Sequence, residues 1–149
     1  RALIPADGNP DLPGDAAQFA NYDSHRLMLG LPDGSRDLVL EKAILLESGF
    51  DELHGVDWQK GCYMGQELTA RTKYRGLVKK RLVPITIDGA LPAAGTPVML
   101  NSKKVGEVRS GRDGRALALM RLEYLENADA TFTVDGATVA PTKPDWAEF

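Results

Sequence analysis

The spacing of apolar residues near the start of the chain predicts a helix over residues 15–29. Helical intervals relate Phe19, Tyr22, Arg26 and Leu27. Asp15 is a residue type that favours the N-cap position, where its side chain accepts a hydrogen bond from the first turn. Gly30 is suited to cap the C-terminus, and Pro32 prevents the helix from continuing. We expect a turn around Asp33-Gly34 to follow, with Asp33 and Asp37 as turn formers rather than an acid/base pair.

Two further segments lie between this turn and Lys80. Residues 38–46 (LVLEKAILL) carry so many apolar side chains that their period does not distinguish a helix from a buried strand. Residues 65–75, in contrast, are bounded by glycines and contain good helix formers, which predicts a helix. Glu67 lies in its first turn and Arg71 toward its end, where the helix dipole favours these charges.

From Lys80 onward the pattern changes to short strands separated by turn residues. The strands fall within residues 81–89, 96–111, 114–122 and 131–141. Asn101-Ser102-Lys103 and Asp135-Gly136 are typical of hairpin turns. Such a series suggests a small closed barrel or a sandwich. We therefore predict an α+β protein, with a helix-and-loop region over residues 1–78 and a small antiparallel β-barrel over residues 79–149. Because the first region has few clear strands, we expect it to be part of a larger domain in a longer protein.

Composition narrows the functional classes. Hydrophobic residues make up 43% of the 149 residues, which is enough for a folded core. No apolar run approaches the ~18 residues of a membrane-spanning helix. The single cysteine excludes an internal disulfide, and with two histidines far apart in the sequence it argues against a metal site. A reducing compartment fits this cysteine usage best.

The net charge of −3 conceals a basic central region. Residues 1–60 contain 11 acidic and 5 basic residues, whereas residues 61–110 contain 3 acidic and 9 basic ones. Six cations fall within eleven residues: Arg71, Lys73, Arg75, Lys79, Lys80 and Arg81. Such a block attracts anions, although a solvated surface stripe explains it equally well. Tyr74 is its one aromatic residue, so nucleic acid is a weak candidate partner.

Residues 60–67, KGCYMGQE, place the only cysteine between two glycines and after a lysine. The thiolate is the reactive form of cysteine, and nearby cations and helix N-termini favour it. Cys62 precedes the predicted helix, and Lys60 is two residues away. Gly61 and Gly65 would allow the backbone to turn sharply. A small buried cysteine packed between glycines is an equally good interpretation of these residues.

The longer stretch KGCYMGQELTARTKYRG, residues 60–76, resembles the signature K-G-C-[Y/F]-x-G-Q-E of the YgfZ family of folate-binding proteins. The similarity extends upstream through NYDSHRLMLGLPDGSRDL and downstream through VKKRLVPI, from about Asp15 to the end of the chain. That family includes mitochondrial proteins that help to mature iron–sulfur enzymes. It belongs to the glycine-cleavage T-protein superfamily, whose members have three domains around a central folate site. The resemblance implies that this chain holds the later part of the folate-binding region and the C-terminal barrel.

The resemblance further implies a tetrahydrofolate-binding accessory protein in iron–sulfur cluster assembly or repair. Its partners would be folate and iron–sulfur enzymes or assembly factors, with no membrane partner. It would act in a bacterial cytoplasm, or in the mitochondrial matrix of a eukaryote. Cys62 would be the reactive thiol, serving as a transient cluster ligand, redox group or one-carbon acceptor, and Lys60 would favour its thiolate. Whether such a protein is an enzyme stays open.

Four residues of the same stretch are candidate folate contacts. Gln66 and Glu67 carry groups that could position a folate ring or brace the turn. Arg71 could bind a carboxylate of the folate tail, or it could pair with Glu67 four residues earlier, which the spacing favours slightly. Tyr63 is the fourth candidate, although packing in the core is the more common role for such a tyrosine.

Two alternatives remain. The first is a folate-dependent aminomethyl or one-carbon transferase of the T-protein type. Those enzymes carry a carboxylate in an Arg-Leu-Glu-Ala-Gly pattern, and here Met28 occupies the acidic position within residues 26–30, which argues against this activity. The second is an interaction module whose basic residues 71–81 dock on an acidic partner.

Overall fold

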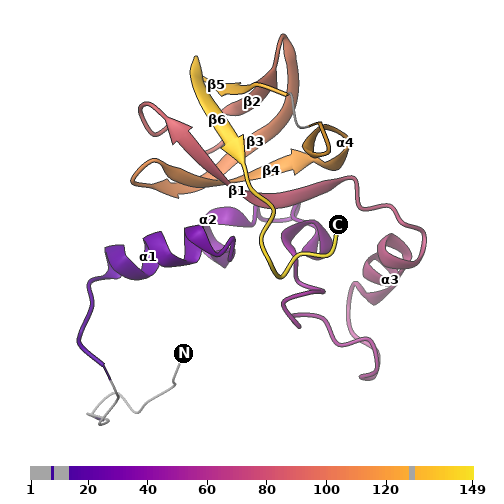
Figure 1. The fold of residues 1–149 in the computed structure, drawn as a ribbon. Helices are drawn as coiled ribbons and strands as arrows, with labels where there is room; N and C mark the ends of the chain where they lie inside the picture. The colour runs from indigo at the N-terminus through magenta and orange to yellow at the C-terminus, as the bar shows by residue number, and fades with distance from the viewer. Residues whose placement is uncertain (1–7, 9–13, 128–129) are drawn as a thin grey trace.

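The computed structural model describes residue 8, residues 14–127 and residues 130–149 (Figure 1). Its helical elements are α1 (Phe19–Met28), α2 (Gly34–Asp37), the 3₁₀ helix η1 (Leu45–Ser48), α3 (Gln66–Tyr74) and α4 (Leu122–Leu125). Its strands are β1 (Lys80–Asp88), β2 (Pro97–Leu100), β3 (Lys103–Arg112), β4 (Arg115–Arg121), β5 (Phe132–Val134) and β6 (Ala137–Pro141). No described residue before Lys80 lies in a strand. The predicted α+β class is therefore confirmed.

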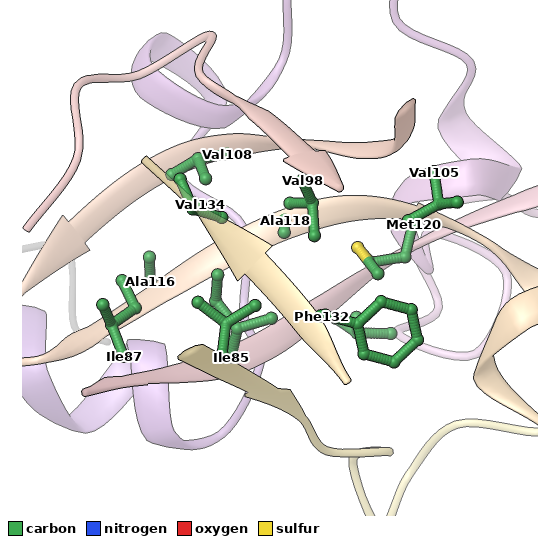
Figure 2. Close-up of a cluster of buried hydrophobic side chains, with 12 residues drawn as sticks. Ile85, Ile87, Val98, Val105, Val108, Ala116, Ala118, Met120, Phe132 and Val134 are labelled. Carbon is green, nitrogen blue, oxygen red and sulfur yellow. The ribbon is translucent and has the colours of Figure 1, made fainter. Parts of the chain in front are cut away.

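The six strands close into an antiparallel barrel in the order β1-β4-β3-β2-β5-β6. Both predicted hairpin turns are present, and they need left-handed backbone at Asn101 (φ 54°) and Asp135 (φ 48°). Twelve buried side chains fill the barrel, and Figure 2 shows Ile85, Met120 and Phe132 among them. Alternating residues of β1 and β4 supply much of this core, and the strands were predicted from the turn residues that separate them. The short helix α4 after β4 was not predicted.

Helix α1 begins later than the sequence predicted. Its first residue is Phe19, and Asn21 Oδ1 accepts a hydrogen bond from the Gln18 backbone N–H at 3.1 Å. The prediction of Asp15 as N-cap was wrong, since Gln18 and Asn21 make the capping contacts instead. The C-terminal prediction was right: Gly30 has φ 74° and closes the helix.

The stretch 38–46 forms neither of the two structures that its composition suggested. Residues 39–42 make a turn, and η1 begins only at Leu45. Gly49, with φ 76°, ends η1 in a left-handed conformation. Of the dense apolar residues here, Leu46 is buried, whereas Leu40 is 89% exposed. High apolar density therefore did not indicate a regular, fully buried element.

A buried ionic cluster fastens α1 and α2 to the barrel. Arg26 Nε lies 2.8 Å from Asp23 Oδ1, and its Nη1 lies 2.8 Å from Asp37 Oδ2. Ser110 of β3 accepts a 2.6 Å hydrogen bond from Arg26 and donates one of 2.6 Å to Asp37. Asp37 thus does more than form a turn. Because each buried charge has an opposite partner, the cluster avoids the large cost of an isolated buried ion.

A small apolar contact lies beside this cluster. Leu27 of α1 packs against Leu82 and Leu117 on the outside of the barrel. Figure 1 shows α1 beneath the barrel, where this contact forms. Helix α1 is therefore attached by apolar packing as well as by charge.

None of the helices in the described part of the chain has the length and apolar character needed to cross a membrane.

Candidate functional site

The turn that carries Cys62 is shaped by hydrogen bonds on one side and by a glycine on the other. Asp57 Oδ1 accepts hydrogen bonds from the backbone N–H groups of Gln59, at 2.8 Å, and Lys60, at 3.3 Å. On the other side, Gly65 is the N-cap of α3 and has φ 86°, a conformation that disfavours any residue with a Cβ. Gly61 has no such requirement, because its φ is not left-handed and an added Cβ would meet nothing within 4 Å. The expectation that both glycines are needed for the turn therefore holds for Gly65 alone.

Cys62 is a free, exposed thiol that precedes the first residue of α3, Gln66, by four positions. The interpretation as a buried packing cysteine is wrong, since the side chain is open to solvent among the residues that the structure describes. Lys60 Nζ lies over the Tyr63 ring, 5.0 Å from its centroid, which is a cation–π arrangement. The lysine is therefore held by the residue that follows the cysteine. Its proposed effect on the thiolate stays a prediction.

The helix behind the thiol is anchored by an acid, a tryptophan and a lysine. Asp51 accepts hydrogen bonds from Trp58 Nε1 at 2.6 Å and from Lys73 Nζ at 2.8 Å. Lys73 Nζ also lies 4.2 Å from the centroid of the Trp58 ring, and Trp58 meets Tyr74 edge-on at 6.0 Å. Burial raises the pKa of Asp51, but the bonds from Lys73 and Trp58 outweigh it and hold that pKa below its ordinary value. These contacts join α3 to the loop that leads into the motif.

The end of α3 is closed by a six-residue backbone motif. The backbone N–H of Gly76 donates to Lys73 O at 3.1 Å, and that of Leu77 donates to Thr72 O at 3.0 Å. This is the Schellman arrangement, which Gly76 permits with φ 60°. The predicted helix over residues 65–75 is thus confirmed, with helical residues from 66 to 74.

The candidate folate contacts differ in how they are presented. Glu67 and Arg71 are exposed on α3, and they do not form an ion pair in the described part of the structure, so the pairing favoured by their spacing was wrong. Gln66 is half-buried at the start of the helix. Tyr63 is also half-buried, and its buried hydroxyl has no hydrogen-bond partner among the described residues. The unpaired guanidinium of Arg71 and the unsatisfied hydroxyl of Tyr63 therefore lie on either side of Gln66 in the sequence.

Several members of the basic block are used inside the protein. Lys73 pairs with Asp51, as described above, and Arg81 Nη1 lies 2.9 Å from Glu52 Oε1 and 2.7 Å from Leu46 O. These two cations are not free to meet a partner. Arg71, Arg75 and Lys79 remain exposed. Residues 71–81 therefore do not act as one uniform docking surface.

The site can supply one sulfur ligand or nucleophile. Within residue 8 and ranges 14–127 and 130–149, no three His, Cys, Asp or Glu side chains gather as metal ligands. A cluster bound at Cys62 would need its remaining ligands from another molecule or from a part of the protein outside this chain. The sequence did not reveal the roles of Asp51 and Trp58. Both depend on contacts with Lys73, which lies 22 residues after Asp51. The only local signal was a tryptophan two residues before the KGCYMGQE motif.

Comparison with known proteins identifies the type of barrel. Residues 79–149 match the family model described as the C-terminal β-barrel domain of CAF17. The barrel is therefore similar to a domain of this type. The match begins one residue before β1 and runs to the last residue of the chain. The similarity to the CAF17 barrel thus covers the second half of the molecule, whereas the candidate thiol lies in the half before it.

Two mammalian proteins align with nearly the whole chain. The mouse protein named iron–sulfur cluster assembly factor IBA57, mitochondrial, is 37% identical over 155 residues, which cover 98% of this chain and 43% of the mouse protein. Its human counterpart is 36% identical, again over 98% of this chain and 43% of the relative. A homologue from Neurospora crassa is 42% identical over 58% of this chain. The chain therefore spans less than half the length of the mouse and human relatives. The expected link to iron–sulfur assembly factors is confirmed at the level of homology, and membership of the YgfZ family itself stays a prediction.

Proposed function

We propose that this chain belongs to an iron–sulfur cluster assembly or repair protein in which Cys62 is the working thiol. The observation that carries the proposal is the exposed thiol of Cys62 on a fixed turn at the start of α3. A structural cysteine would be expected to lie in the core, whereas an exposed thiol ahead of a helix is available to iron or to another thiol. The similarity to proteins named as iron–sulfur cluster assembly factors supports the same role. If the protein is eukaryotic, the names of these relatives favour a mitochondrial location, while the bacterial cytoplasm is the alternative.

Tetrahydrofolate binding is the second part of the proposal. The chemistry of the residues fits a folate in part: Arg71 offers an exposed guanidinium for a tail carboxylate, and Gln66 offers an amide that can both donate and accept. Tyr63 contributes a buried hydroxyl with no partner among the described residues. Its ring is already covered by Lys60 on one face, so ring stacking would use the other face. Folate, when bound, would supply a one-carbon carrier, while these side chains would bind and orient it.

A titration with tetrahydrofolate separates the two parts. The full-length protein should bind tetrahydrofolate, and Arg71→Met should bind it several-fold more weakly. Cys62→Ala should bind it normally but should fail to support iron–sulfur enzyme activity. The exposed neighbour Arg75 provides a matched control, since Arg75→Met removes the same charge from the same helix end. Equal binding by both arginine variants would remove Arg71 from the folate site.

No observation on the described residues supports the transferase alternative. Met28, at the position where the resembling enzymes carry a carboxylate, is half-exposed and offers no acid or base. Turnover of methylene-tetrahydrofolate by the full-length protein without any need for Cys62 would favour the transferase and contradict the proposed function.

A further inference from the structure

A groove on the outer face of the barrel lies apart from the thiol-bearing turn. It consists of three adjoining hollows of about 360, 270 and 590 Å³. The first two share Lys80, Glu107, Arg109 and Leu119, and the third joins the second at Lys80 and Arg121. We call these hollows the barrel groove. None of its lining residues belongs to residues 60–76, so a ligand bound there would be independent of the proposed role of Cys62.

The barrel groove has a basic lining with apolar side chains between the charges. Six cations line it: Lys42, Lys79, Lys80, Lys104, Arg109 and Arg121. The structure gathers them from the loop after α2, from the residue before β1, and from β1, β3 and β4, which is why residues 71–81 alone did not reveal the surface. Leu82 and Leu119, opposite each other on β1 and β4, provide apolar surface beside them.

The cations outnumber the acids available to neutralise them. Lys104 and Arg109 share one carboxylate, that of Glu107. Arg121 reaches Glu123 only at 3.5 Å, where both side chains are half or more exposed. Lys42, Lys79 and Lys80 form no ion pair among the described residues. In a chain of net charge −3, this groove is therefore a local site of positive charge.

One arrangement in the groove opposes barrel stability. Lys80 of β1 lies directly opposite Arg121 of β4 in the antiparallel register. Like charges at directly opposed positions destabilise a sheet, and an oppositely charged pair there would stabilise it. Both side chains line the groove. An anionic ligand bridging the two would relieve this repulsion.

We propose that the barrel groove binds an extended, acidic polypeptide segment of a partner protein. The cations are spread over three hollows in series rather than converging on one point, which suits a chain of carboxylates better than a single small anion. Apolar side chains between the charges suit a polypeptide whose acidic and apolar residues alternate. No aromatic side chain lines the three hollows, so the stacking surface that single-stranded nucleic acids use is missing from them.

The probe is a fluorescein-labelled peptide of alternating Glu and Ala, measured by fluorescence anisotropy with the full-length protein. Binding should weaken steeply as salt rises, because added ions screen exposed charges. The double variant Lys80→Glu/Arg121→Glu should bind about tenfold or more weakly, because rim charges govern such association. The control Arg75→Glu/Arg115→Glu changes charge equally at exposed positions outside the groove and should bind normally. Three results would overturn the proposal. They are equal binding by the two double variants, binding of a Gln-Ala peptide as tight as that of the Glu-Ala peptide, and tighter binding of an oligothymidine.

Two single variants keep the test valid if the double variant unfolds. Lys80→Glu replaces the opposed like charges by an opposed pair of unlike charges but also loses the attraction between Lys80 and Glu47, so it should stay folded while weakening peptide binding. Glu47→Gln removes an acid from the first hollow and should strengthen peptide binding about twofold. A folded Lys80→Glu protein that binds the peptide as well as wild type contradicts the proposal, as does a Glu47→Gln protein that binds it more weakly.

Discussion

Lys73 Nζ lies 2.8 Å from Asp51 Oδ2, and this contact fastens the helix behind Cys62 to the loop in front of it. Trp58 completes the arrangement by donating to the other oxygen of Asp51. Because α3 makes few contacts with the barrel and its Thr72 is its only buried residue, the anchor supplies much of what holds the helix in place. The position of the thiol therefore depends on an ion pair outside the motif.

Removing the lysine of this pair should loosen α3. Lys73→Met should lower the free energy of unfolding by about 1 kcal/mol, because the pair is only partly buried. It should also speed amide hydrogen exchange across residues 66–74, which reports local opening. Arg75→Met is the control, since Arg75 is exposed and lies at the same end of the helix. Unchanged exchange in Lys73→Met would show that packing alone holds α3.

The two glycines of the motif should respond differently to alanine. Gly65→Ala should cost about 1 kcal/mol of stability, because φ 86° places a Cβ in a strained conformation. Gly61→Ala should cost close to nothing, since its φ is not left-handed and the space around it is open. Urea unfolding of both variants provides the comparison. A similar loss in both would contradict the conformations described for this turn.

Acid should destabilise the attachment of α1 and α2 to the barrel. Hydrogen bonds from Arg36, and further ones from Arg112 and Arg26, hold the pKa of Asp23 well below its ordinary value in spite of burial. A carboxyl with a lowered pKa stabilises the fold above the pKa of the unfolded chain, about 4, and this stabilisation is lost as pH falls below it. Melting temperature should therefore fall steeply below about pH 4.

The variant Asp23→Asn tests the origin of that acid sensitivity. It should be less stable than wild type by about 3 kcal/mol at neutral pH, because it leaves buried Arg26 with one acidic partner fewer. Its melting temperature should also depend less on pH below 4 than that of wild type. Parallel pH curves for the two proteins would assign the acid sensitivity to other carboxyls, such as Asp51 and Glu107, whose pKa values are also lowered.

The barrel could be predicted because its signals are local. Short strand-like segments separated by turn residues, such as those at Asn101 and Asp135, indicate strands and hairpins without knowledge of the rest of the fold. The structure of residues 38–46 could not be predicted because their apolar side chains have different surroundings: Leu46 is buried, whereas Leu40 is exposed. Burial at such positions is decided by long-range packing, which no local period encodes.

The same distinction between local signals and long-range packing explains which side-chain contacts could be predicted. Helical spacing related Arg26 to Leu27 and two earlier aromatic residues, but its partners Asp37 and Ser110 lie 11 and 84 residues away. Spacing also favoured a pair between Glu67 and Arg71, yet both side chains remain exposed and unpaired with each other. Exposed helical pairs gain little from contact, so proximity in sequence does not guarantee that they form.

The most direct test of the proposed role is the activity of iron–sulfur enzymes in cells whose own protein is replaced by Cys62→Ala. Met64→Ala serves as the matched control, because Met64 lies in the same turn and is 99% exposed. Both variants should fold normally, as judged by circular dichroism and melting temperature. If Cys62 is the working thiol, iron–sulfur enzyme activity should fall with Cys62→Ala and stay normal with Met64→Ala. Normal activity in cells with folded Cys62→Ala would contradict that role.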